Sequence, residues 1–130
     1  MDNLLLEKTK HLQEDLRQAL ARFKEALELP ATHIHRDATI QRFEFCFELS
    51  WKLMVSIAKY EGIDAFGPRD AIRTAAQTGC INDPGAWFAM LEARNLTTHT
   101  YNEAIAADVY EKAKLLPPLI DALLVQVKKP

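Results

Sequence analysis

The segment 37–62 constrains the fold most, because its apolar residues recur with the period of a helix. On a helix of about 100° per residue, they form two adjacent stripes that together cover about half of the surface. The stripes consist of Ile40, Phe43, Phe47, Trp51, Met54 and Ala58, and of Cys46, Leu49, Leu53 and Ile57. The remaining polar arc consists of Gln41, Glu44, Glu48, Lys52 and Lys59. A helix with one packing partner needs a narrower stripe, so this segment is expected to pack on two sides.

Two interpretations of this wide apolar surface stay open. The helix is either central and contacted on two sides by its own chain, or packed on one side against a second subunit. The second interpretation predicts a homodimer interface at Phe45, Leu49, Trp51 and Leu53. The pattern alone does not separate the two.

The rest of the chain divides into helical segments whose ends are marked by proline, glycine and capping residues. Asp37 is expected to cap the start of the long helix, and Gly62 to end it in a left-handed conformation. The other predicted segments are 3–29 before Pro30, 68–79 with Pro68 first and Gly79 last, 83–95 with Asp83 as cap before Pro84, and 100–127 with a kink or restart at Pro117 and Pro118.

No segment shows the apolar and polar alternation of a strand, and no repeat or low-complexity stretch is present. The chain of 130 residues matches one domain that buries roughly two thirds of its unfolded surface. The predicted fold is therefore all-α, an up-and-down bundle of four to five antiparallel helices in a single domain, residues 1–130, which forms a homodimer.

The charge balance excludes a protein that holds nucleic acid non-specifically. The net charge is −2 and the isoelectric point is near 6.1, so there is no general basic field and any RNA contact must be local. Nothing at the start resembles a signal peptide, and no apolar run approaches the roughly 20 residues of a membrane span. We expect a soluble, cytoplasmic protein.

Cysteine and histidine offer little metal chemistry. Cys46 and Cys80 have neither disulfide nor metal spacing and suit a reducing compartment. His33 and His35 flank Ile34 without a third ligand nearby in sequence, so a helix-entry loop is favoured over a metal site. We expect neither a metal nor another cofactor.

The stretch RNLTTHTY at 94–101 is too polar for a core helix and lacks the usual loop residues. On an unbroken helix Arg94 and His99 would project about 140° apart. Thr100 and Glu103 have the spacing of a capping box, which predicts that one helix ends near Asn95 and the next begins at Thr100. His99 would then lie just before a helix start, where partial positive charge favours phosphate and a neutral imidazole.

One interpretation of this arrangement is metal-independent RNA cleavage. His99 would take the proton of a ribose 2′-hydroxyl, while Arg94 and Asn95 would hold the non-bridging oxygens of the attacked phosphate. The alternative is structural: Arg94 pairs with Glu92 or an acid on another helix, His99 fills a helix junction, and the threonines cap. The spacing alone favours this structural alternative.

Several other side chains are candidates for supporting roles. Candidate phosphate ligands are Arg36, Arg42, Arg69 and Arg73, although scattered arginines more often form surface ion pairs. Arg42 falls inside the apolar arc, which predicts an acidic partner across a subunit interface. Trp51 and Trp87 lie on apolar stripes and are expected to be core or interface anchors. The chain has no Gly-Ser pair followed by spaced aspartates, so nucleotidyl transfer would need another chain.

Four motifs together carry a family resemblance: RDATIQRFEFCFELSWK at 36–52, PR at 68–69, G-x-I-x-D at 79–83 and WFAMLEARNLTTHTYNE at 87–103. Through them the chain resembles the substrate-binding partners of two-protein minimal nucleotidyltransferases, within the HEPN superfamily. RNLTTHTY is similar to the R-x4-H-x-Y signature of HepT toxins in HepT/MntA toxin–antitoxin pairs. The resemblance extends from Arg36 to about Val109.

The resemblance implies a helical dimer that brings two copies of Arg94 and His99 towards a shared cleft. It implies a ribonuclease silenced by an MntA-like minimal nucleotidyltransferase, which attaches AMP to the tyrosine of the motif, here Tyr101. Bulk and negative phosphate at that position would obstruct substrate RNA. An older description of the family implies instead a non-catalytic substrate-binding adaptor, by likeness to a helical domain of aminoglycoside nucleotidyltransferases, although fold does not decide function.

Overall fold

The computed structural model describes residues 3–127, and this part of the chain is helical, without strands. The elements are α1 (Asn3–Leu27), α2 (His33–Tyr60), α3 (Gly67–Gln77), α4 (Pro84–Asn95), the short 3-10 turn η1 (Thr97–His99), α5 (Glu103–Ala113) and α6 (Leu116–Val127). The predicted all-α fold is confirmed.

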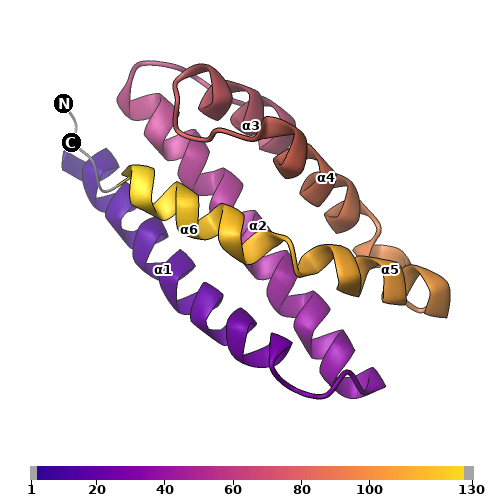
Figure 1. Ribbon diagram of the computed structural model, residues 1–130. Helices are drawn as coiled ribbons and strands as arrows, with labels where there is room; N and C mark the ends of the chain where they lie inside the picture. Colours follow the sequence, from indigo (N-terminus) through magenta and orange to yellow (C-terminus); the bar gives the residue numbers. More distant parts are fainter. Residues whose placement is uncertain (1–2, 128–130) are drawn as a thin grey trace.

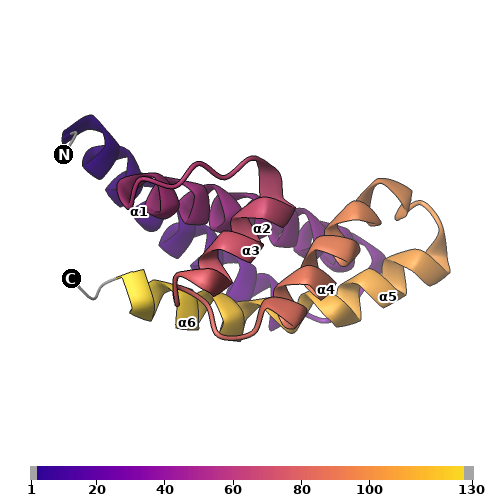
Figure 2. The same ribbon diagram turned by 90° about the horizontal axis from the view of Figure 1, so that it is seen from above.

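Helix α2 is the centre of the bundle. It runs antiparallel to α1 (Figure 1) and contacts α1, α3, α4, α5 and α6. Figure 2 shows α5 and α6 following one another along the bundle, with the turn between α4 and α5 at the end opposite to the two chain termini. The wide apolar surface of α2 is therefore explained largely by its own chain, and the homodimer stays a prediction.

A line of aromatic rings forms the middle of the core. Phe23 of α1 contacts Phe43, Phe43 contacts Phe47 one turn later, and Phe47 contacts Trp87 of α4, with centroid distances of 6.3, 6.5 and 6.4 Å. At most 1% of each of these residues is exposed. Aromatic pairs at such separations add to the stabilisation from apolar burial. Trp87 is therefore a core anchor, as predicted.

The start of α2 differs from the prediction. The helix begins at His33 with Thr32 as its cap, and the His35 N–H donates to Thr32 Oγ1 at 3.2 Å. Asp37 lies inside the helix, so its predicted capping role is wrong. Threonine is itself a capping residue, and no residue between it and Asp37 breaks a helix. The first helix also ends at Leu27, slightly earlier than predicted.

Most other helix ends follow the sequence signals. Gly62 and Gly79 have φ angles of 82° and 79°, the left-handed conformation expected after a helix. Asp83 caps α4 by accepting from the Ala86 N–H at 3.0 Å. The break at Pro117 is also confirmed, because α5 ends at Ala113 and a new helix carries both prolines in its first turn, where a missing N–H costs least. No helix within residues 3–127 is long and apolar enough to cross a membrane.

Candidate functional site

The polar stretch lies at the junction between α4 and α5, where the backbone breaks as predicted. Helix α4 ends at Asn95, and the turn η1 separates it from α5. The predicted capping box is wrong, because Asn102 caps α5 by accepting from the Ile105 N–H at 3.1 Å. Thr100 instead donates to the Thr97 carbonyl at 3.0 Å. Asparagine caps at least as well as threonine, and Glu103 is bound by another residue.

His99 and Tyr101 lie on the exposed side of this junction. Their rings meet edge to face with centroids 6.1 Å apart, and 87% of Tyr101 is exposed. His99 ends the 3-10 turn, three residues before the cap Asn102. Since helix-terminus effects fade within one turn, α5 does not provide the strong local field predicted at His99. Both rings are accessible to a macromolecule.

Arg94 points from the last turn of α4 towards α2. Its Nε and Nη2 lie 2.6 and 2.5 Å from Oε1 of Glu48, and Nη1 donates to Asn95 Oδ1 at 3.0 Å. The guanidinium also lies over the Phe47 ring, 5.9 Å from its centroid. The structural alternative thus holds for this residue, with Glu48 rather than Glu92 as the acid. About 29% of the Arg94 side chain stays exposed, so a ligand can still reach it.

Two acids of α2 complete the junction, and sequence reasoning missed both. Glu48 binds Arg94 through Oε1 and accepts from Trp51 Nε1 through Oε2 at 2.8 Å. Burial is the main cause that raises the pKa of Glu44, the neighbouring charge of Glu48 adds to it, and Thr97 and Arg94 oppose it. The available signal was two acids one turn apart at the edge of an apolar stripe.

Arg36 is bound rather than free for phosphate. Its Nη1 and Nη2 donate to the two carboxylate oxygens of Glu103 at 2.7 and 2.8 Å. These hydrogen bonds are the main cause that lowers the pKa of Glu103. The pair connects the first turn of α2 to the start of α5, and His33 Nε2 lies 3.9 Å from the same carboxylate. Arg36 therefore holds the junction in place.

The other three candidate arginines also bind their own chain. Arg42 Nη1 donates to the Arg22 carbonyl at 2.7 Å, beside a cavity of about 320 Å³ between α1 and α2. Arg69 lies over the Phe88 ring at 5.5 Å, and Arg73 lies 4.0 Å from Asp70. Within the described residues, none of these contacts reaches 94–101. Within one chain these contacts do not join the arginines into a single phosphate patch. Arg42 binds a backbone carbonyl of its own chain, and the acid expected for it across a subunit interface stays a prediction.

The predicted dimer interface is only partly at the surface. Phe45 is 54% exposed, while Leu49 and Trp51 are half-buried against the core. Leu53 is 0% exposed in its own chain. A residue without accessible surface cannot contact a second subunit, so the prediction for Leu53 is wrong. The other three stay predicted interface residues.

The cysteines and histidines do not form a second centre. Burial raises the pKa of Cys46 to about 12 and that of Cys80 to about 11, and neither is in a disulfide. High thiol pKa values oppose nucleophilic chemistry. Among residues 3–127, no group of three or more histidine, cysteine or acidic residues is arranged to bind a metal ion.

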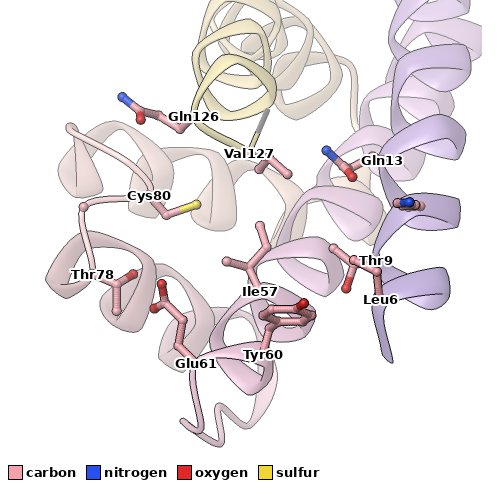
Figure 3. Close-up of a pocket in the computed structure, with 12 residues that line it drawn as sticks. Leu6, Thr9, Gln13, Ile57, Tyr60, Glu61, Thr78, Cys80, Gln126 and Val127 are labelled. Carbon is pink, nitrogen blue, oxygen red and sulfur yellow. The ribbon is translucent and has the colours of Figure 1, made fainter. Parts of the chain in front are cut away.

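A larger cavity lies at the other end of the bundle, near the chain termini. Its volume is about 780 Å³, and its walls come from α1, α2, α6 and the turn after α3. Figure 3 shows Ile57, Val127 and the Cys80 sulfur directed towards it, with the amide of Gln13 on the α1 side, while the amide of Gln126 points away. This size is within the range of small-molecule sites.

The sequence and the structure are similar to those of known proteins. Residues 12–129 match the family described as nucleotidyltransferase substrate binding protein like. Over 76 residues the chain is 40% identical to a protein named "Probable ribonuclease HepT" from Haemophilus influenzae strain KW20. That match covers 55% of this chain and 52% of the relative, so it spans about half the length of the curated protein.

Two solved structures are similar over most of the chain. A crystal structure of a Thermus thermophilus protein has a TM-score of 0.82 and 32% identity, and the match covers 88% of this chain and 99% of that one. The protein HI0074 from Haemophilus influenzae, described as having the fold of a substrate binding domain of a nucleotidyltransferase, has a TM-score of 0.69 and 26% identity, with 95% and 99% covered. Since the family model spans nearly the whole chain, this protein belongs to the nucleotidyltransferase substrate-binding-protein-like family, which includes HepT-like proteins.

Proposed function

We propose that this chain is the toxin half of a two-protein nucleotidyltransferase system and cleaves RNA without a metal. The observation that carries the proposal is the junction between α4 and α5, where a partly exposed Arg94, Asn95 and an exposed His99 surround one backbone break. Similarity to a probable ribonuclease supports the choice of reaction. The setting is the cytoplasm, where RNA is available.

In the proposed reaction, His99 accepts the proton of a ribose 2′-hydroxyl, and the oxygen attacks the adjacent phosphorus. The bond to the 5′-oxygen breaks and that oxygen takes a proton from water, which leaves a 2′,3′-cyclic phosphate and a 5′-hydroxyl end, and His99 then returns its proton to the solvent. Arg94 and Asn95 bind the non-bridging oxygens as charge accumulates in the transition state. A homodimer through Phe45, Leu49 and Trp51 brings two copies of the site together.

Tyr101 is the proposed regulatory position. A separate MntA-like nucleotidyltransferase transfers AMP from ATP to its phenol, and pyrophosphate leaves. The exposure of 87% and the edge contact with His99 support this role, because an attached nucleotide would lie next to the proposed base. Incubation with the partner and ATP should add the mass of one AMP per chain to the wild type and nothing to Tyr101→Phe.

The ribonuclease is tested on purified protein. Arg94→Ala and His99→Ala should each lower the rate of cleavage of total RNA by at least about 100-fold, while circular dichroism and gel filtration remain unchanged. Thr98→Ala is the matched control, because Thr98 is an exposed residue of the same turn and has no assigned role. Cleavage that persists in both site variants would contradict the proposal.

The cavity of about 780 Å³ favours a second candidate function, a non-catalytic adaptor that presents a small substrate to the nucleotidyltransferase. Its lining combines apolar walls with amides, hydroxyls and two charged side chains, Lys10 and Glu61, as small-molecule sites combine apolar walls with a few polar groups. The adaptor should form a complex with the nucleotidyltransferase in gel filtration, and the wild-type chain should leave RNA intact.

A further inference from the structure

We propose that Glu48 is the positioning residue for Arg94 and that Trp51 in turn holds Glu48; this inference rests on the proposed ribonuclease function. The three residues form a chain of hydrogen bonds from α2 to the site. Trp51 Nε1 donates to Glu48 Oε2 at 2.8 Å, and Glu48 Oε1 accepts from Arg94 Nε at 2.6 Å. Both carboxylate oxygens are thereby engaged, which leaves Glu48 little freedom to rotate.

The atoms that Glu48 binds decide what Arg94 can still do. An arginine has five N–H donors. The Nε–H is donated to Glu48, Nη2 is in ion-pair contact with the same carboxylate oxygen, and one N–H on Nη1 is donated to Asn95. Within the described residues, one N–H on each terminal nitrogen therefore remains for a ligand. Two such donors are what a phosphate needs for a pair of parallel hydrogen bonds.

The surroundings restrict the guanidinium further. Phe47, which is fully buried, places its ring 5.9 Å below Arg94 Cζ. Of the side chains of Arg94 and Glu48, 29% and 31% are exposed, so the pair is shielded on one side and open on the other. A flexible arginine would lose rotamer entropy on binding phosphate, whereas this one is ordered beforehand. Glu48 therefore acts on RNA through Arg94.

Glu48 is negatively charged, so its proposed contribution is to orient Arg94 and not to attract RNA. A carboxylate beside the binding position repels a phosphate, so a role in affinity alone would make Glu48 unfavourable. Positioning predicts that loss of Glu48 lowers kcat more than it raises KM. A misplaced catalytic group costs up to about 100-fold in rate, so we expect a decrease of roughly 10- to 100-fold in Glu48→Ala.

The first measurement does not depend on cleavage. Nitrogen-15 NMR of the Arg94 Nε–H, assigned by its absence in Arg94→Lys, should show a signal that exchanges slowly with water. In Glu48→Ala the exchange should be at least about tenfold faster, and in Glu48→Gln intermediate, because the amide oxygen still accepts. Glu92→Ala is the matched control, since Glu92 is an exposed acid on the same helix as Arg94. Equal exchange in wild type and both Glu48 variants overturns the inference.

The second measurement is a double-mutant cycle in RNA cleavage. If Glu48 works through Arg94, the double variant with both residues replaced by alanine should be no slower than Arg94→Ala alone. Effects that multiply would show an independent role of Glu48 and overturn the inference. A wild type that does not cleave RNA refutes the proposed function, and the exchange measurement then still decides whether Glu48 orients Arg94.

Discussion

Two arginine–glutamate pairs connect α2 to the region around the α4–α5 junction, and they use the guanidinium differently. Arg36 gives both terminal nitrogens to the two oxygens of Glu103. Arg94 instead turns the edge formed by Nε and Nη2 towards a single oxygen of Glu48, so Glu48 does not cover the end of the guanidinium between Nη1 and Nη2. The same residue types therefore pair through the end of the guanidinium in one place and through its side in the other.

The positions of the pairs on their helices account for part of this difference. Glu103 is the first residue of α5, where a negative charge interacts favourably with the helix dipole, and Arg94 lies in the last turn of α4, where a positive charge does. Arg36, in the first turn of α2, reaches the first residue of α5 with the two terminal nitrogens of its side chain. Arg94 lies beside α2, so Glu48 meets the side of the guanidinium.

The largest expected difference between the pairs is in catalysis. Arg94→Ala should lower the rate of RNA cleavage by about 100- to 1,000-fold, the usual effect of removing a donor that stabilises a transition-state anion. Arg36→Ala should lower it by less than about tenfold, because that residue only holds the junction. Single-turnover cleavage of one RNA measures both. Equal losses would contradict the distinction.

The second difference concerns local order. Arg36→Ala should speed amide hydrogen exchange in residues 100–105 by on the order of tenfold, because the start of α5 loses its connection to α2. Arg94→Ala should leave exchange there unchanged. Hydrogen exchange with mass spectrometry measures both variants, and Lys112→Ala, further along α5, serves as control. Unchanged hydrogen exchange in Arg36→Ala would contradict the proposal that Arg36 holds the start of α5 against α2.

A smaller effect is expected in the dependence of stability on pH. The pKa of Glu103 is lowered in the folded protein, chiefly by hydrogen bonds from Arg36. The pair therefore contributes stability above the unfolded pKa, about 4.3, and this contribution is lost as the pH falls through the folded value. Urea unfolding at several pH values should show that wild type loses more stability on acidification than Arg36→Ala. Parallel profiles would contradict the assignment.

The smallest effect is expected at Glu44, next to the Arg94 pair. Burial raises its pKa in the folded protein, so the ionised form opposes folding, and stability decreases as the pH rises through the folded value. Glu44→Gln should slightly increase the free energy of unfolding at pH 7. Below the unfolded pKa, about 4.3, both states are protonated and the gain should disappear. If the stability gain of Glu44→Gln persists in acid, its cause is the packing of the new side chain and not the removed charge.

Most helix ends were set by local sequence signals. The prolines and glycines at helix ends, the cap Asp83 and the break after Asn95 were predictable, because each depends on a few neighbouring residues. Asp37 failed as a cap, since Thr32 offered an equally local alternative. Thr100 failed in the same way, since Asn102 caps α5. Rules that depend on neighbouring residues therefore predicted which segments are helical more accurately than they predicted the residue at which each helix begins.

The site depended more on distant contacts. The importance of residues 94–101 was visible in their polarity, but the partners Glu48 and Trp51 are on a helix more than forty residues away in the chain. The periodicity of α2 showed a wide apolar surface, and the placement of Leu53 inside the core rather than at an interface required three dimensions. Arg36 was a candidate phosphate ligand in the sequence, and only the structure showed that it binds Glu103.

By itself, then, the sequence determined an all-helical chain, the approximate extent of its helices and the polar break that marks the candidate site, because periodicity and capping act over a few residues. The tertiary structure decided which carboxylate binds each arginine and through which edge of the guanidinium. Such pairings depend on how helices distant in sequence approach one another, and that approach is set by the packing of the whole core.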